Sequence, residues 1–125
     1  MPGKRIFIID DEKEILDSLS RRLKNDGYEV LTASLGREAV QQVKDTLPDL
    51  LLVDIVLPDI DGPEVIVLIQ EDAAAARIPV IFFSGIISRE GQGYYSEIKA
   101  GGKVFPAISK PFPYNELVTL IQRYV

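Results

Sequence analysis

The chain has 125 residues, of which 46% are hydrophobic and 26% are charged, and it contains no cysteine and no histidine. This length suits one domain that buries a core without disulfides or a structural metal. Fourteen Lys and Arg against nineteen Asp and Glu give a net charge of −5, which disfavours nucleic-acid binding through a basic face. Without thiols or imidazoles, any chemistry must come from carboxylates, hydroxyls, lysines and backbone groups.

No segment is long and apolar enough for a membrane span or a signal peptide. The longest apolar stretch, Ile78–Ile87, is about half the roughly 18–20 residues that a transmembrane helix needs. The four apolar residues before Asp10 are too few for the core of a signal peptide. We therefore expect a cytoplasmic protein without membrane contact.

Short apolar runs alternate along the chain with segments of helical spacing. Four runs are predicted strands: Ile6–Ile9, Tyr28–Ala33, Leu50–Val53 and Val80–Phe83. A fifth apolar stretch leads to Lys110. Solid apolar runs are typical of parallel strands that are buried on both faces, whereas the alternating pattern of Tyr28–Ala33 suits a position nearer an edge.

Helical spacing separates these strands. The predicted helices have apolar stripes at Ile15–Leu23, Ala39–Val43, Val65–Ile69 and Leu117–Tyr124. Asn25-Asp26-Gly27 stops the first helix, and Pro63 suits the start of the third. Glycines dilute the helical pattern of Ser88–Gly102, so any helix there should be short or mobile.

The alternation of strand and helix, repeated about five times, predicts an α/β fold. Right-handed crossovers between parallel strands then place helices on both faces of a doubly wound sheet. We expect five parallel strands in one domain that spans residues 1–125. No internal repeat, low-complexity tract or linker interrupts the chain.

Polar residues follow each buried strand, at the edge where doubly wound sheets bind their ligands. Asp10-Asp11-Glu12 follows the first strand and Asp54 the third. Ser84 ends the fourth strand, and Lys110 follows the fifth apolar stretch. If the first and third strands are neighbours, Asp10, Asp11 and Asp54 converge in one crevice.

Three carboxylates in one crevice repel one another unless a cation neutralises them. A hard divalent cation is the simplest answer, and Mg²⁺ typically binds one or two carboxylates together with waters and a substrate phosphate. The ammonium of Lys110 suits a phosphoryl oxygen, and Ser84 offers a hydroxyl donor. Each residue alone is as well explained by a helix cap, a turn or a solvated surface. Their occurrence together, at the ends of different strands, favours a functional site.

Four stretches resemble the response-regulator receiver domain over essentially the whole chain. They are Ile8-Ile9-Asp10-Asp11-Glu12, Leu52-Val53-Asp54 with Pro58 and Gly62 following, Phe83-Ser84-Gly85 and Ser109-Lys110-Pro111-Phe112. The family's sheet has the flavodoxin-like order 2-1-3-4-5. The resemblance also implies a cis peptide between Lys110 and Pro111, in line with the tolerance of X–Pro bonds for the cis form.

The resemblance implies a role for each site residue. Asp54 is the expected phosphoacceptor, while Asp11 and the backbone carbonyl of Val56 join Asp54 in binding Mg²⁺. Asp10 contributes to the metal site through water. Ser84 hydrogen-bonds the phosphoryl group and Lys110 pairs with it.

The implied function is that of a two-component signalling domain and not of a turnover enzyme. The donor is a phosphohistidine on a sensor histidine kinase or a phosphotransfer protein. Phosphorylation then switches a surface toward an unknown output partner, with a homodimer as a possibility and no direct nucleic-acid binding. With 125 residues, an effector must lie on another chain or on residues absent from this one.

Several positions depart from the family pattern. The aromatic residue expected three positions before Lys110 is Ala107, and Phe105 either substitutes for it or leaves the switch without an aromatic residue. Pro113 stands where a capping residue usually begins the last helix, and Gly85 loosens the loop after Ser84. Val56 and Ile86 are apolar and orient no water toward Asp54, so we expect slow self-dephosphorylation.

Three alternatives remain at this point. A Mg²⁺-dependent phosphatase with an aspartyl-phosphate intermediate needs a second acid two residues after the nucleophile, where this chain has Val56. A flavodoxin-like cofactor carrier needs a phosphate-binding loop after the first strand, where Asp10-Asp11-Glu12 would repel a phosphate. A degenerate receiver that only binds partners is disfavoured by Asp54 and Lys110, although Ala107 keeps it open.

Overall fold

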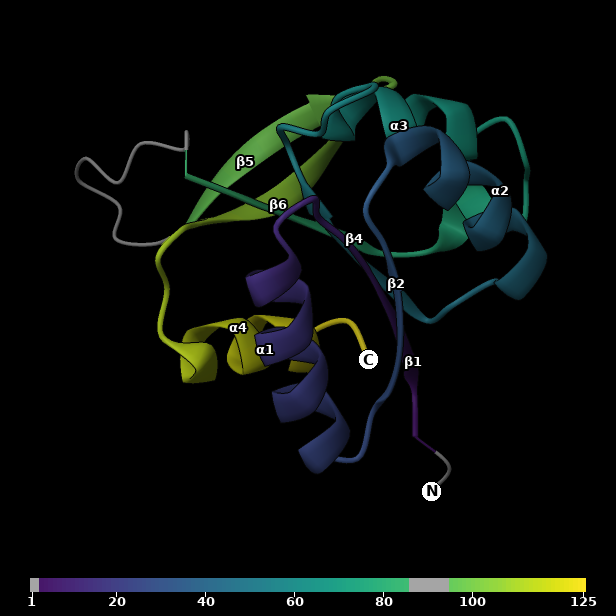
Figure 1. The fold of residues 1–125 in the computed structure, drawn as a ribbon. Helices are drawn as coiled ribbons and strands as arrows, with labels where there is room; N and C mark the ends of the chain where they lie inside the picture. Colours follow the sequence, from purple (N-terminus) through teal and green to yellow (C-terminus); the bar gives the residue numbers. More distant parts are fainter. Residues whose placement is uncertain (1–2, 86–94) are drawn as a thin grey trace.

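A sheet of mainly parallel strands lies between two layers of helices in the computed structural model (Figure 1). The structure describes residues 3–85 and 95–125. The elements in chain order are β1 (Arg5–Ile9), α1 (Lys13–Asn25), β2 (Glu29–Ala33), α2 (Gly36–Thr46), β3 (Leu50–Asp54), α3 (Gly62–Ile69), η1 (Ala75–Arg77), β4 (Val80–Ser84), β5 (Tyr95–Ala100), β6 (Lys103–Ser109) and α4 (Tyr114–Gln122).

The strand order of the sheet is β2-β1-β3-β4-β6-β5. The first five strands in this order are parallel to one another. They reproduce the predicted order 2-1-3-4-5, with β6 in the place of the fifth strand, so the predicted parallel sheet is confirmed. The sheet has one strand more than predicted, because β5 pairs antiparallel with β6.

The segment before β6 differs from the expected short helix. Residues 95–100 form the strand β5, and residues 86–94 lie outside the described part of the chain. Gly101 and Gly102 connect β5 to β6 with φ angles of 58° and 81°. Two consecutive residues with positive φ form the type I′ turn that two-residue hairpins favour, and glycine adopts it without steric cost. Gly101 and Gly102, two of the glycines that weakened the helical pattern, thus provide a hairpin turn.

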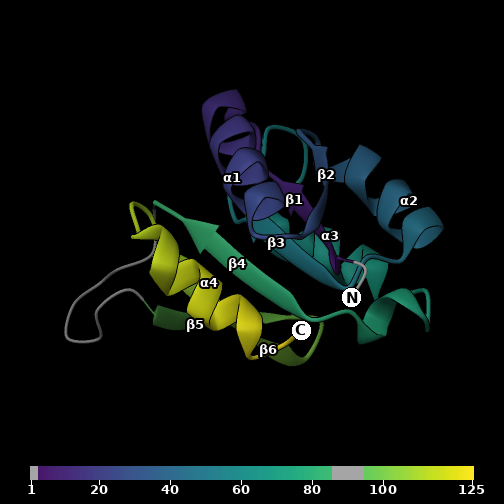
Figure 2. The same cartoon turned by 90° about the horizontal axis from the view of Figure 1, so that it is seen from below.

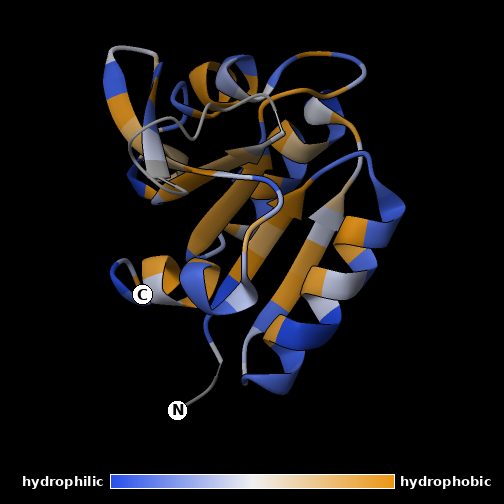
Figure 3. Cartoon of the chain, turned by 90° about the vertical axis from the view of Figure 1, so that its left-hand side faces the viewer, coloured by the Kyte–Doolittle hydropathy of each residue, from blue (hydrophilic) through white to orange (hydrophobic). Residues whose placement is uncertain are grey.

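Alternating side chains of the strands fill two separate cores, one on each face of the sheet. Phe7, Leu51 and Phe82 point toward α2 and α3. Ile6, Leu52 and Phe83 point toward α1 and α4. Figure 2 shows the two helix pairs on opposite sides of the sheet, and Figure 3 shows the hydrophobic strands between them. Helices on both faces are confirmed. None of the described helices has the length and hydropathy to cross a membrane.

The two last helices of the chain start differently. The carboxylate of Asp61 caps α3 by accepting a hydrogen bond of 2.8 Å from the backbone N–H of Glu64. Pro113 is the N-cap of α4 and has no side-chain acceptor, as the sequence indicated. The loop before α4 contains the predicted cis peptide between Lys110 and Pro111. Both loops lie at the carboxyl ends of strands, where the site is expected.

The loop after β3 is held close to the strand by Gly62. Its N–H donates a hydrogen bond of 2.8 Å to the carbonyl oxygen of Ile55. A Cβ atom at Gly62 would lie 2.3 Å from the backbone oxygen of Asp54. Only glycine permits this approach, so the residue fixes the position of the backbone around Asp54.

We predict that Gly62→Ala destabilises the fold by about 1–3 kcal/mol, because a methyl group must displace the backbone of Asp54. Gly85→Ala is the matched control, since a Cβ at Gly85 meets nothing within 4 Å. It should change stability by less than about 0.5 kcal/mol. Urea unfolding followed by circular dichroism measures both variants, and equal transition midpoints would contradict the role assigned to Gly62.

Candidate functional site

Two buried carboxylates lie side by side at the carboxyl end of the sheet. β1 and β3 are neighbours with Ile9 opposite Val53, and Asp10 and Asp54 each follow one of these residues. The exposed fractions of Asp10 and Asp54 are 0% and 4%. The sequence analysis placed Asp10, Asp11 and Asp54 in one crevice if these strands were neighbours. The strands are neighbours, and Asp10 and Asp54 lie together at their ends.

Glu12 completes the acidic cluster, a role that the sequence analysis did not assign to it. Carboxylate oxygens of Asp10, Glu12 and Asp54 all lie within 4.8 Å of one another. The N–H of Glu12 also donates a hydrogen bond of 2.9 Å to Oδ1 of Asp10. Asp11 is exposed and is not a member of this cluster. The signal for Glu12 was present as the third acid of the Asp-Asp-Glu run.

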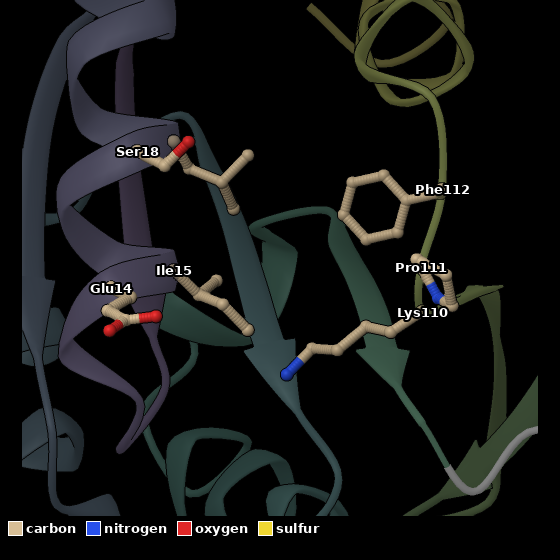
Figure 4. A pocket seen from close by; sticks show the side chains of 7 residues that line it. Glu14, Ile15, Ser18, Lys110, Pro111 and Phe112 are labelled. Carbon is tan, nitrogen blue, oxygen red and sulfur yellow. The ribbon is translucent and has the colours of Figure 1, made fainter.

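Lys110 contacts all three carboxylates of the acidic cluster. Its Nζ donates to Asp10 at 2.9 Å, to Glu12 at 3.1 Å and to Asp54 at 3.1 Å. Figure 4 shows its side chain extending away from Pro111 and Phe112. Nζ also lies 4.8 Å from the centroid of the Phe83 ring, within the range of a cation–π interaction. The lysine thereby joins the end of β6 to the ends of β1 and β3.

Burial and charge set the protonation of the site. Burial raises the pKa of Asp10 to about 6, against the opposing effects of the Glu12 N–H and Lys110. The charge of Asp54 adds to the increase. Burial lowers the pKa of Lys110, but Asp10 and Asp54 outweigh it and raise this pKa above its ordinary value. The site thus holds the ammonium of Lys110 and disfavours the ionised form of Asp10.

The backbone brings Ser84 to the same edge of the sheet. Ser84 ends β4 and pairs with Ser109, the residue before Lys110. Val56, two residues after Asp54, is 54% exposed, and its N–H donates to Oδ1 of Asp54 at 3.3 Å. Val56 therefore borders the phosphoacceptor candidate, whereas Ile86 lies outside the described residues. The roles of Ser84 and of the Val56 carbonyl stay predictions.

Phe105 occupies the same face of β6 as Ala107. Both side chains belong to the core next to α2 and α3, and Ala107 is fully buried. The Phe105 ring packs edge to face on Phe82, with 6.0 Å between the centroids. Residues two apart on a strand share a face. Phe105 thus presents its ring on the face of the expected switch residue, one pleat farther from Lys110.

The loop after β3 is also fixed through Asp59, another residue without an assigned role in the sequence. Its carboxylate accepts hydrogen bonds from the N–H groups of Gly36 at 2.8 Å and Arg37 at 2.9 Å. These donors are the first residues of α2, whose N-cap, Leu35, provides no side-chain acceptor. The bond from Arg37 makes the largest contribution to lowering the pKa of Asp59 to about 2. Asp59 therefore ties α2 to the loop that carries Val56.

An open pocket of about 410 Å³ adjoins Lys110. Figure 4 shows that α1 forms one wall and the loop between β6 and α4 the other. The lining residues are Glu14, Ile15, Ser18, Leu19, Lys110, Pro111 and Phe112. The pocket leaves space for another molecule beside the lysine.

The site has the composition of a hard-cation site. Three carboxylates face a single ammonium, so the cluster keeps net negative charge when its acids are ionised. Mg²⁺ prefers oxygen ligands, and its charge would favour the ionised form of Asp10, whose pKa is raised mainly by burial. The residues present therefore fit this ion.

Comparison with protein-family models matches residues 6–122 to the response regulator receiver domain. The protein PilG of Pseudomonas aeruginosa is 32% identical over 126 residues, which cover 98% of this chain and 88% of PilG. A structure of the chemotaxis protein CheY4 of Vibrio cholerae matches with a TM-score of 0.83 at 24% identity, covering 98% of this chain and 99% of that one.

A second similar structure is the receiver domain of the sensor histidine kinase PA1611 from Pseudomonas aeruginosa. It has a TM-score of 0.79 at 22% identity and covers 98% of this chain and 97% of that one. At this identity the likeness concerns the fold. The family match and the likeness to PilG span nearly the whole chain. The chain therefore belongs to the response-regulator receiver domains, the phosphoacceptor domains of two-component signalling.

Proposed function

We propose that Asp54 is the residue that accepts the phosphoryl group in this receiver domain. The observation that carries the proposal is the contact of its carboxylate with Lys110 Nζ at 3.1 Å, beside Asp10 and Glu12. Asp54 is the last residue of β3, a central strand. Lys110 lies beside it, where its positive charge would face the negative charge of a transferred phosphoryl group. Among the described aspartates, only Asp10 and Asp54 are both buried and in contact with Lys110.

Mg²⁺ is the proposed cofactor, with Asp10, Asp11, Asp54 and the carbonyl of Val56 as the residues that hold it. The fit of the acidic cluster to a hard cation supports the ion, and the similar PA1611 receiver domain has a magnesium ion coordinated in its active-site cleft. Lys110 already engages the Glu12 carboxylate, whose side chain is 59% exposed. Asp11 stays in the proposed set because the receiver resemblance assigns it as a ligand, and Glu12 is proposed as a contact of Lys110.

The chemistry is a phosphoryl transfer from a phosphohistidine to a carboxylate. An oxygen of Asp54 forms a bond to phosphorus while the bond from phosphorus to the histidine nitrogen breaks. The transition state is loose, with negative charge on the equatorial oxygens, so the protein mainly positions and neutralises. Lys110 supplies one positive charge to these oxygens, and the Ser84 hydroxyl donates a hydrogen bond. Bound Mg²⁺ supplies further neutralisation of this charge.

The donor in this proposal is a sensor histidine kinase or a phosphotransfer protein. The pocket between α1 and the loop after β6 opens beside Lys110, so a partner docked there reaches the acidic cluster. The product adds negative charge and strong acceptors at one end of the sheet. This charge would switch a partner-binding surface, with Phe105 as the candidate aromatic residue.

The protein is a signalling domain, and slow self-dephosphorylation is part of the proposal. Val56 is apolar and 54% exposed next to Asp54, and it offers no side-chain donor or acceptor to a hydrolytic water. The same residue disfavours the phosphatase alternative, which needs an acid at this position. A cytoplasmic location and the identity of the output partner stay predictions.

Incubation with acetyl phosphate and Mg²⁺ tests the phosphoacceptor directly. The wild-type chain should gain the mass of one phosphoryl group, because Asp54 is the nucleophile that attacks phosphorus. Asp54→Asn should gain none, whereas the exposed Asp17→Asn should behave as the wild type. A persistent adduct on Asp54→Asn, in intact-mass spectrometry of freshly labelled protein, would assign the phosphoryl group to another residue.

Asp10→Asn should stabilise the protein in the absence of Mg²⁺. Burial raises the pKa of Asp10 to about 6 from 3.8, so folding disfavours the ionised carboxylate at neutral pH. The gain is on the order of 1–3 kcal/mol at pH 7 and falls as the pH drops through 6 toward 4, where wild-type Asp10 is protonated when folded. Thermal unfolding across this range measures it. Saturating Mg²⁺ should reduce the gain, and a variant less stable than wild type at pH 7 without metal would contradict this account.

Paired substitutions distinguish the two candidate ligands next to Asp10. Asp11→Asn should weaken Mg²⁺ binding by about tenfold or more, because a direct charged ligand is lost. Glu12→Gln should weaken it less, because the Glu12 side chain is 59% exposed and is not one of the proposed ligands. Isothermal titration with Mg²⁺ measures both affinities. The reverse order would make Glu12 the ligand and exclude the assignment of Asp11.

A further inference from the structure

The outer edge of the sheet ends in β5. Within the described ranges, 3–85 and 95–125, β5 pairs with β6 on one side and with no strand on the other. The free edge of a strand presents backbone N–H and C=O groups that match those of another strand. We therefore asked which groups of β5 point outward.

The proline in β6 settles the orientation of the β5 backbone. Pro106 lies directly opposite Glu97 and has no N–H to donate. Opposite residues of an antiparallel pair either exchange both backbone hydrogen bonds or exchange none, and these two kinds alternate. The Glu97–Pro106 pair must be of the second kind. The backbone groups of Glu97, and of Lys99 two residues later, therefore point away from β6 to the free edge.

The charges on β5 select one register for pairing with an identical strand. The side chains of Glu97 and Lys99 are both exposed and lie on the same face. An antiparallel pair centred on Ile98 places Glu97 of each copy opposite Lys99 of the other. Centring the pair on Glu97 sets two glutamates opposite each other, and centring it on Lys99 sets two lysines opposite each other. Of these three registers, the one centred on Ile98 matches the outward backbone groups and also sets opposite charges against each other.

The opposite face of β5 adds apolar contacts in that register. Ile98 lies opposite Phe105 on β6, and both are half-buried against the core next to α2 and α3. Pairing two copies on Ile98 aligns Phe105, Ile98 and the same two residues of the second copy in one row. Cross-strand apolar pairs of this kind stabilise sheets. The partly exposed surface of Ile98 is thereby covered.

We propose that β5 is a homodimer interface, in which two copies of this chain pair antiparallel with Ile98 at the two-fold axis. Each Glu97–Lys99 pair exchanges both of its backbone hydrogen bonds and brings opposite charges together. A second copy is the occupant because the edge complements itself. The two sheets then form one continuous sheet, and the acidic cluster stays outside the interface.

Charge reversal tests this register. Wild-type protein should show a concentration-dependent dimer in sedimentation velocity. Glu97→Lys and Lys99→Glu should each weaken the dimer by about tenfold or more, because like charges then face each other twice. The double variant Glu97→Lys/Lys99→Glu should restore the dimer. An equimolar mixture of the two single variants should also form it, since one chain then carries two lysines and the other two glutamates.

Glu29→Lys on β2, the strand at the other end of the sheet, is the matched control and should dimerise as the wild type. Circular dichroism and thermal unfolding confirm that each variant is folded. The proposal is overturned if the wild type stays monomeric up to millimolar concentration. It is also overturned if the single reversals leave the dimer unchanged, if the mixture of single variants fails to associate, or if Glu29→Lys abolishes the dimer.

Discussion

The contact of one ammonium with three carboxylates is the interaction on which the site depends. The sheet forces Asp10 and Asp54 together because they follow opposite residues of neighbouring parallel strands, and neither strand can move without opening both cores. Lys110 reduces the resulting repulsion from a loop that follows a third strand of the sheet. One positive charge does not balance three negative ones. The remaining negative charge makes the cluster suited to a divalent cation. Together with Lys110, such a cation would stabilise the charge of a transferred phosphoryl group.

Contacts outside the acidic cluster fix the loop that follows Asp54. Gly62 allows the following loop to touch the Asp54 backbone, and Asp59 fastens the same loop to the start of α2. A carboxylate that must meet phosphorus in line benefits from a fixed position, because misplacement of reacting atoms is costly in rate. The opposite side of the site is built differently. There, β6 carries Lys110 and also pairs with β5, so the lysine and the edge strand share one element.

Solid apolar runs and helical stripes in the sequence predicted the parallel strands and the helices on both faces, because these patterns depend on burial that any fold of this class requires. The strand order was implied by the resemblance to receiver domains. The sequence did not predict the strand at residues 95–100, where it indicated only a weakened helical pattern. Helical and strand patterns are hard to separate in a short segment with few apolar residues. Residues 95–100 form a strand because they pair with β6 and because Gly101 and Gly102 allow a tight turn between the two strands. Neither the pairing nor the turn conformation can be read from the apolar pattern of the segment.

The sequence by itself determined the chemistry of the site: which carboxylates, hydroxyls and lysines stand at strand ends, in an order typical of receiver domains. This succeeds because the carboxyl ends of parallel strands always meet at one edge of the sheet. Only the tertiary structure decided that Glu12 joins Asp10 and Asp54, that Lys110 touches all three, and that Asp59 secures α2. Those contacts depend on side-chain directions between segments far apart in the chain, and spacing along a sequence does not encode such distances.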